Sequence, residues 1–188
     1  MLVYIASQPL ISYNIGMYSK KDINKFIIFL SDLLALENIP SIEIAEVPYP
    51  RYSFLANKII LNNKNFDDRL LIVYLAHEMY HAYQFQNQFD GIEKCFKSYY
   101  APDKDNEKYY TQEFELEAFA FQTFIMSIIG IQLDYTESHP NLPDISDRVE
   151  AMYYDFRKEE ILSSLEYSGI NYSATSYRVV DKTFLVCF

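Results

Sequence analysis

Two histidines four residues apart, His77 and His81, lie within the stretch Leu70–Gln84, which has the pattern of a buried helix. Residues four apart on an α-helix share one face, one turn above the other, so both imidazoles can point to the same place. The first turns, Leu70–Leu75, are apolar on most sides, which is typical of a helix in a core. The rest of the chain is therefore expected to pack around this helix.

The segment from His77 to His81 also matches the H-E-x-x-H motif, with Glu78 as its acidic residue. Glu78 is turned about 100° around the helix axis from His77, so its carboxylate can reach a metal-bound water rather than the metal. Two ligands, a general base and an open position for water are the parts of a zinc hydrolase. The alternative interpretation is a pair of solvated or core histidines. The chain has only 3 histidines, and two of them are in the motif.

Length and composition indicate one globular domain, residues 1–188. A chain of 188 residues can bury a sizeable core, and 50% of its residues are hydrophobic. The net charge of −10 repels phosphate backbones, which argues against direct nucleic-acid binding. Cys95 and Cys187 are far apart in the sequence and form no CxxC pair, so both are interpreted as free thiols in a reducing compartment, with a single disulfide as the alternative.

We expect neither a signal peptide nor a membrane span in this sequence. The apolar run at the N-terminus has no basic start and is broken by Gln8 and Pro9. The longest apolar candidate, Phe114–Leu133, is interrupted by Glu115 and Glu117. We therefore predict a cytoplasmic protein with no membrane partner, and its oligomeric state stays open.

Hydrophobic periodicity predicts further helices and strands on both sides of the motif helix. The helical segments repeat apolar residues every three or four positions, and the strand segments alternate apolar and polar residues or are rich in β-branched and aromatic ones. The predicted helices are Lys20–Asn38, Tyr109–Ile129 and Ser146–Ser164, and the predicted strands are Ile42–Val47, Asn57–Leu61 and Tyr177–Cys187.

A catalytic zinc site needs a third protein ligand in addition to the two histidines. A third histidine six residues after the second would require His at 87 and Gly at 84, but Asn87 and Gln84 stand there. The remaining histidine, His139, lies in a proline-flanked loop. The other source is a carboxylate on the predicted helix Tyr109–Ile129.

That helix has three candidate carboxylates, on Glu113, Glu115 and Glu117. Glu113 and Glu117 are four apart and share a face. Glu115 points to roughly the opposite side, since two residues turn a helix by about 200°. Only one of these faces can look at the motif helix, and helix geometry leaves the choice open.

The H-E-x-x-H motif and the downstream run E-x-x-A-x-x-F, which begins at Glu115, resemble the gluzincin-type zincin metallopeptidases. They are most similar to the ImmA/IrrE-like peptidases, and the resemblance covers roughly Ile59–Phe124. It implies that Glu115 is the third zinc ligand. The chain departs from the pattern at Phe119, where many relatives carry an Asp or Asn that braces a ligand histidine.

The resemblance also implies an α+β fold. We expect a single zincin-like domain in which a small, mostly antiparallel sheet packs on the motif helix and on a second helix that carries Glu115. The catalytic core would span about residues 42–130. In zincins an edge strand binds the extended substrate, and Asn57–Leu61 lies at the corresponding place in the sequence.

The function implied is a zinc-dependent metallopeptidase that hydrolyses peptide bonds of an intracellular protein or peptide substrate. Zn²⁺ would be held by His77, His81 and Glu115. Glu78 would take a proton from the water and pass it to the leaving amine. The alternative is a catalytically weak or inactive zincin-like protein that acts by binding a host or regulatory partner.

Peptide hydrolysis also needs a donor that stabilises the oxyanion. His139, Tyr109 and Tyr110 are the candidates in this sequence. A structural zinc site with four protein ligands is a weaker interpretation, because no cysteine lies near the motif.

Overall fold

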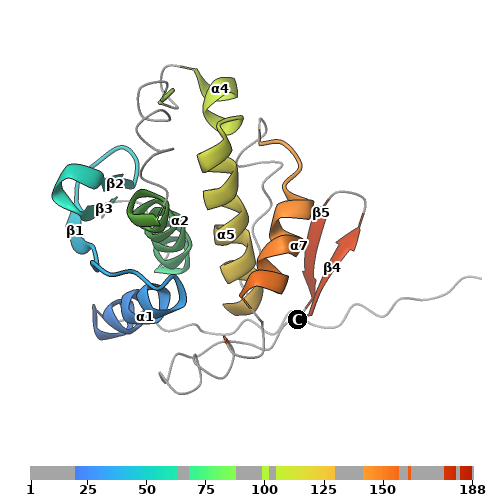
Figure 1. The fold of residues 1–188 in the computed structure, drawn as a ribbon, viewed down its shortest axis with the longest axis horizontal. Helices are drawn as coiled ribbons and strands as arrows, with labels where there is room; N and C mark the ends of the chain where they lie inside the picture. Colours follow the sequence, from blue (N-terminus) through green and yellow to red (C-terminus); the bar gives the residue numbers. More distant parts are fainter. Residues whose placement is uncertain are drawn as a thin grey trace, which may run out of the picture.

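The fold mixes α-helices with short β-strands, and two helices cross at its centre (Figure 1). It was obtained as a computed structural model. The residues that the structure describes are 20–62, 68–87, 99–101, 105–129, 142–156, 161, 176–180 and 183–187.

The helices and strands follow one another in mixed order along the chain. The helices are α1 (Lys20–Leu33), α2 (Asp68–Asn87), α4 (Asn106–Tyr110), α5 (Glu113–Ile129) and α7 (Ser146–Asp155), with a 3₁₀ turn η1 at Phe54–Ala56. The strands are β1 (Ser41–Ala45), β2 (Arg51–Ser53), β3 (Lys58–Asn62), β4 (Ser176–Val180) and β5 (Thr183–Cys187).

The sheet beside α2 has the strand order β1-β3-β2. Strands β2 and β3 form an antiparallel pair joined through η1, and Asn57 turns the chain with a left-handed backbone at φ 42°. Strand β1 pairs with the other side of β3 in parallel, with Ile42 opposite Ile59. The link through Pro48 and Pro50 therefore carries the chain from one edge of the sheet to the other.

Two expectations about this sheet are wrong. The sheet is mixed rather than mostly antiparallel, because its longest pairing, β1 with β3, is parallel. The predicted edge strand Asn57–Leu61 corresponds to β3, which lies in the middle. The edge nearer the motif helix is β2, a strand of three residues that the sequence did not predict. A strand so short has too little alternation to be recognised by pattern.

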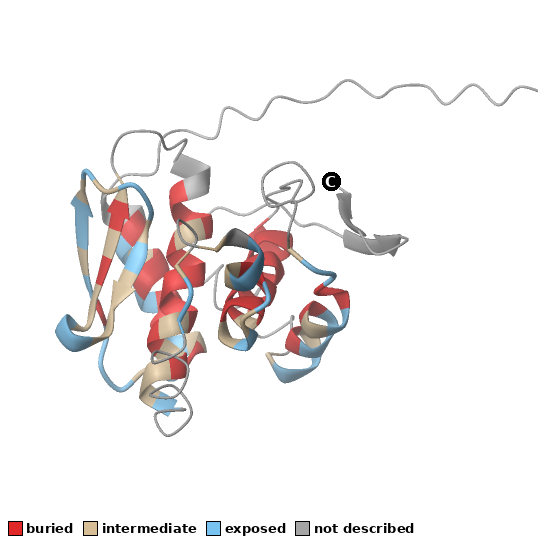
Figure 2. Cartoon of the chain, turned by 90° about the horizontal axis from the view of Figure 1, so that it is seen from above, coloured by how far each residue is buried: buried red, intermediate tan, exposed pale blue. Residues whose placement is uncertain are grey.

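The core lies mainly between α2, α5, α1 and the inner face of the sheet. Figure 2 shows buried residues along most of α2 and α5. Ala118 and Ala120 of α5 are fully buried, as are Ala76 and Ala82 of α2. Small side chains at the contact let two helices approach closely. This approach allows a short side chain on one helix to reach the other.

Helix α1 ends at Leu33, before the predicted end at Asn38. Ala35 adopts a left-handed backbone with φ 48°. The N–H groups of Ala35 and Leu36 then donate to the carbonyls of Asp32 and Ser31, which is the hydrogen-bond pattern of a Schellman motif. The stop was not foreseen because this position usually carries glycine and here carries alanine.

The predicted helix Tyr109–Ile129 is two helices, α4 and α5, with a break at Thr111 and Gln112. The Thr111 hydroxyl donates to carbonyls of α4, and the Gln112 amide bonds to the backbone of Tyr100 and Tyr109. Residues six apart on a continuous helix differ by about 120° in direction. Because the helix is broken between them, Tyr109 and Glu115 need not differ by this angle, and their side chains can point toward each other.

The C-terminal part contains α7, which packs on α5, and a two-stranded antiparallel sheet of β4 and β5. The described part of the predicted helix Ser146–Ser164 is α7 together with Ile161, and the predicted strand Tyr177–Cys187 corresponds to the β4–β5 pair. Among the helices that the structure describes, none combines the length and apolarity needed to span a membrane.

Candidate metal centre

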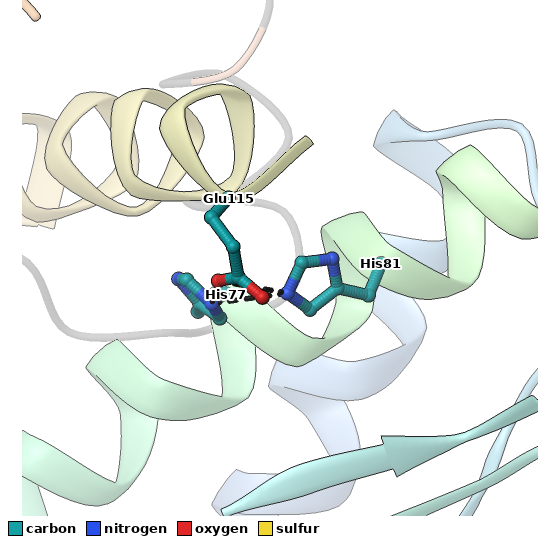
Figure 3. Close-up of side chains that lie close together, drawn as sticks. All are labelled: His77, His81 and Glu115. Carbon is teal, nitrogen blue, oxygen red and sulfur yellow. Dashed lines mark hydrogen bonds and ion pairs between the residues drawn. The ribbon is translucent and has the colours of Figure 1, made fainter. Parts of the chain in front are cut away.

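Helix α2 runs without interruption through the motif, so the two histidines lie on successive turns of one helix face. His77 is 4% exposed, and His81 is half-buried beside it. Both imidazoles point toward α5 (Figure 3). The buried position follows from the sequence, because α2 is apolar on most sides and packs against α5.

Glu115, in the first turn of α5, reaches across to both histidines (Figure 3). Its Oε2 atom lies 3.2 Å from Nε2 of His77 and 3.5 Å from Nε2 of His81. The two Nε2 atoms are 3.1 Å apart. Three ligand atoms from two helices therefore meet at one point, and the Glu115 side chain is only 3% exposed.

This donor set fits one divalent metal ion. Ligand atoms about 2.0–2.1 Å from a tetrahedral ion lie about 3.3–3.4 Å from one another, close to the three distances observed. Two imidazole nitrogens and a carboxylate oxygen suit zinc and several other divalent metals. Of the described residues, His77, His81 and Glu115 are the group whose ligand atoms meet in this way.

The other two candidate carboxylates have different partners. Glu113 is exposed and forms a two-pronged ion pair with Arg148 of α7, at 2.6 and 2.9 Å. Glu117 accepts a hydrogen bond from the side-chain amide of Gln84, at 3.0 Å. A helix turns by about 200° over two residues, so Glu113 and Glu117 point away from the direction of Glu115, and only Glu115 faces the histidines.

The charges of the group stabilise one another. Burial lowers the pKa of His81, but the adjacent Glu115 carboxylate more than offsets this and raises the pKa to about 9. Burial likewise raises the pKa of Glu115, and the charge and hydrogen bonds of the histidines overcome it, so the pKa falls to about 2. The site therefore holds an ionised carboxylate in a buried position.

Glu78 is buried beside the group without being part of it. Burial raises the pKa of its carboxyl, while the two histidines act in the opposite direction. The carboxylate also accepts a hydrogen bond from the backbone N–H of Tyr52 in the edge strand β2. Strand β2 therefore lies directly against the residue expected to act as base.

Tyr109, in α4, is the one predicted oxyanion donor that the structure places in contact with the group. Its hydroxyl is hydrogen bonded to Glu115, and burial raises its pKa well above the usual value, so the hydroxyl keeps its proton. Tyr110 instead packs against the Phe119 ring, with centroids 5.6 Å apart. His139 lies outside the described residues.

The two histidines differ in the hydrogen-bond partner of their Nδ1 atom. Nδ1 of His81 lies 2.8 Å from the side-chain oxygen of Gln84. Nδ1 of His77 is buried and has no hydrogen-bond partner among the residues described, and the His77 ring packs edge-on against Phe119 at 4.6 Å. The contact with Phe119 agrees with the departure noted in the sequence, whereas the role of Gln84 was missed. Its signal was a polar residue one turn after His81 in an otherwise buried helix.

Comparison of the chain with protein-family models, with curated proteins and with solved structures finds no match. Function is therefore inferred from the arrangement of the buried side chains.

Proposed function

We propose that this protein is a zinc-dependent metallopeptidase. The observation that supports the proposal best is the buried meeting of His77, His81 and Glu115, with Glu78 alongside but not among them. A structural metal site needs ligands only, whereas a hydrolase needs a base that stays off the metal. The arrangement provides both.

When bound, a zinc ion would supply Lewis acidity, which makes a water molecule more acidic and polarises the scissile carbonyl. Glu78 takes the proton from that water and transfers it to the leaving amine. In the metal-free site, burial raises the pKa of the Glu78 carboxyl. The hydrogen bond from the Tyr52 backbone holds the carboxylate in place.

Tyr109 is the donor best placed to stabilise the negative oxygen that develops on the attacked carbonyl. Its hydroxyl already contacts the Glu115 carboxylate at the site, and its raised pKa keeps it protonated as a donor. A donor fixed in a buried place stabilises charge more than one in water does.

Strand β2 is the proposed docking place for the substrate. It lies at the edge of the three-stranded sheet and against Glu78. An extended peptide can lie along such an edge and use main-chain hydrogen bonds that require no particular sequence. The proposed substrate is therefore an extended segment of a protein or peptide.

One observation favours a second candidate function, a catalytically weak relative that acts by binding a partner. Nδ1 of His77 has no hydrogen-bond partner among the described residues, and a ligand histidine without such a brace holds metal less firmly. The intact Glu78 favours hydrolysis, because a site used only for binding has no need for a base.

Metal analysis of the purified protein, together with His77→Ala and Glu78→Gln, tests the proposal. We expect one zinc ion per chain in the wild type and in Glu78→Gln, and none in His77→Ala. Hydrolysis of a mixed peptide library should be lost in Glu78→Gln. Wild-type protein without metal after dialysis against zinc would contradict the proposal, and equal biological activity of wild type and Glu78→Gln would favour the binding protein.

A further inference from the structure

We propose that Gln84 and Glu117 form a hydrogen-bond relay that positions His81 for metal binding. The inference rests on the proposed metal site and adds two positioning residues to it. Gln84 lies in α2, three residues after His81, and Glu117 lies in α5, two residues after Glu115.

The orientation of the Gln84 amide is fixed by its partners. Its nitrogen lies 2.9 Å from the carbonyl oxygen of Phe114 and 3.0 Å from a carboxylate oxygen of Glu117. Both of these oxygens accept hydrogen bonds, so the donating NH₂ group must face them. The amide oxygen therefore faces His81, at 2.8 Å from Nδ1.

This orientation determines the tautomer of His81. An amide oxygen can only accept, so Nδ1 of His81 must carry the hydrogen. The lone pair of the neutral imidazole is then on Nε2, the atom that lies 3.5 Å from the Glu115 carboxylate. In its neutral form, His81 therefore keeps Nε2 as the nitrogen that can bind a metal.

The burial of Gln84 shows that the relay is built into the core. Gln84 is 1% exposed, and a buried amide without partners is strongly destabilising. Here both N–H groups donate and the oxygen accepts, so the amide is fully satisfied. The half-buried Glu117 supplies a negative charge at the far end, which strengthens the hydrogen bond to it.

The relay serves one histidine only. A carboxylate behind a ligand histidine fixes its ring and raises its basicity, and here Glu117 acts on His81 through Gln84. Among the described residues, Nδ1 of His77 has no such partner. Loss of the relay should therefore leave neither histidine with a hydrogen bond at Nδ1 from the described residues.

The test compares Gln84→Leu, Glu117→Gln, and the double variant Gln84→Glu/Glu117→Gln, which exchanges amide and carboxylate. Gln86→Leu is the matched control, because Gln86 lies on the same helix but bonds to Asn38, away from the site. For each variant we would measure the zinc dissociation constant by chelator competition and the melting temperature of the metal-free protein. NMR of the zinc-loaded protein would follow the imidazole N–H proton of His81.

We expect Gln84→Leu to weaken zinc binding about 10- to 100-fold and to expose the His81 Nδ1–H proton to rapid exchange. Glu117→Gln should weaken binding about fivefold, because the hydrogen bond remains and the charge is lost. The double variant should recover most of the affinity, because the exchanged carboxylate still accepts from His81. Gln86→Leu should bind zinc like the wild type.

The outcomes separate this inference from the proposed function. Wild type that takes up no zinc would overturn both. Wild type that binds zinc, with a folded Gln84→Leu variant that binds equally tightly, would overturn the relay alone. Should Gln84→Leu fail to fold, the half-exposed position of Glu117 keeps the relay testable. Unchanged affinity in Glu117→Gln, with an unchanged His81 N–H signal, would then overturn it.

Discussion

The Nε2 atoms of His77 and His81 lie 3.1 Å apart, and a carboxylate oxygen of Glu115 lies 3.2 Å from the His77 Nε2 atom, so the three ligand atoms form one group. The two imidazoles come from successive turns of one helix, and the carboxylate comes from a second helix. The three ligand atoms therefore depend on how closely α2 and α5 pack. Such a site is positioned by the core of the protein.

The third ligand can be tested by comparing two neighbouring carboxylates on α5. Glu115→Ala should abolish metal binding, because a buried group of two histidines lacks the third ligand that a catalytic site needs. Glu113→Ala should bind metal like the wild type and lose only an exposed ion pair with Arg148, which contributes about 0–1 kcal/mol. Metal content and urea unfolding measure the two effects. If Glu113→Ala lost the metal and Glu115→Ala kept it, the third ligand would be Glu113, and the assignment to Glu115 would be wrong.

Metal binding should release about one proton from His81 at neutral pH. The raised pKa of about 9 means that the metal-free imidazole is charged at pH 7, and only the neutral form binds metal. Affinity should therefore rise with pH up to about 9 and level off above it. Calorimetry in buffers of different ionisation enthalpy counts the protons. Binding that releases no proton at pH 7 and does not depend on pH would contradict the charged state of His81.

Tyr109→Phe should reduce the rate of peptide hydrolysis about 10²- to 10³-fold, the usual effect of removing one oxyanion donor. Metal should still bind at saturating zinc, because the variant keeps both histidines and Glu115, and the lost hydrogen bond to Glu115 should lower only the affinity. Tyr110→Phe is the matched control, since the Tyr110 ring packs against Phe119 and its ring remains in that variant. Steady-state kinetics on a peptide cleaved by the wild type measure the change. Equal rates in Tyr109→Phe and wild type would give the role to another donor.

Much of the site could be predicted from the sequence, because helical spacing alone places His77, Glu78 and His81. The choice among the three glutamates could not be derived in this way, since it depends on which face of α5 packs on α2. The sequence also did not predict the mixed sheet, because strand order depends on pairing between distant segments. It did not predict strand β2, because three residues show too little periodicity. The contacts of Gln84 with Phe114 and Glu117 of α5 join residues 30 or more apart, so the pattern within one helix does not show them.

Phe119→Asn should strengthen zinc binding while weakening the fold. Phe119 is 3% exposed and packs against His77, so its truncation should destabilise the metal-free protein by about 3–5 kcal/mol, as for other large core deletions. An amide oxygen at this place offers Nδ1 of His77 an acceptor that the wild type lacks among the described residues. The zinc affinity should then rise about tenfold, because bracing a ligand histidine typically changes affinity by 10- to 100-fold.

Phe119→Leu is the control for this change, because it loosens the same part of the core without supplying an acceptor. Its melting temperature should fall, and its zinc affinity should not rise. Chelator competition on folded protein at low temperature separates affinity from stability. If Phe119→Asn and Phe119→Leu bind zinc with the same affinity, the missing brace on His77 does not limit metal binding. The His81 relay through Gln84 would then orient the site without help from the second histidine.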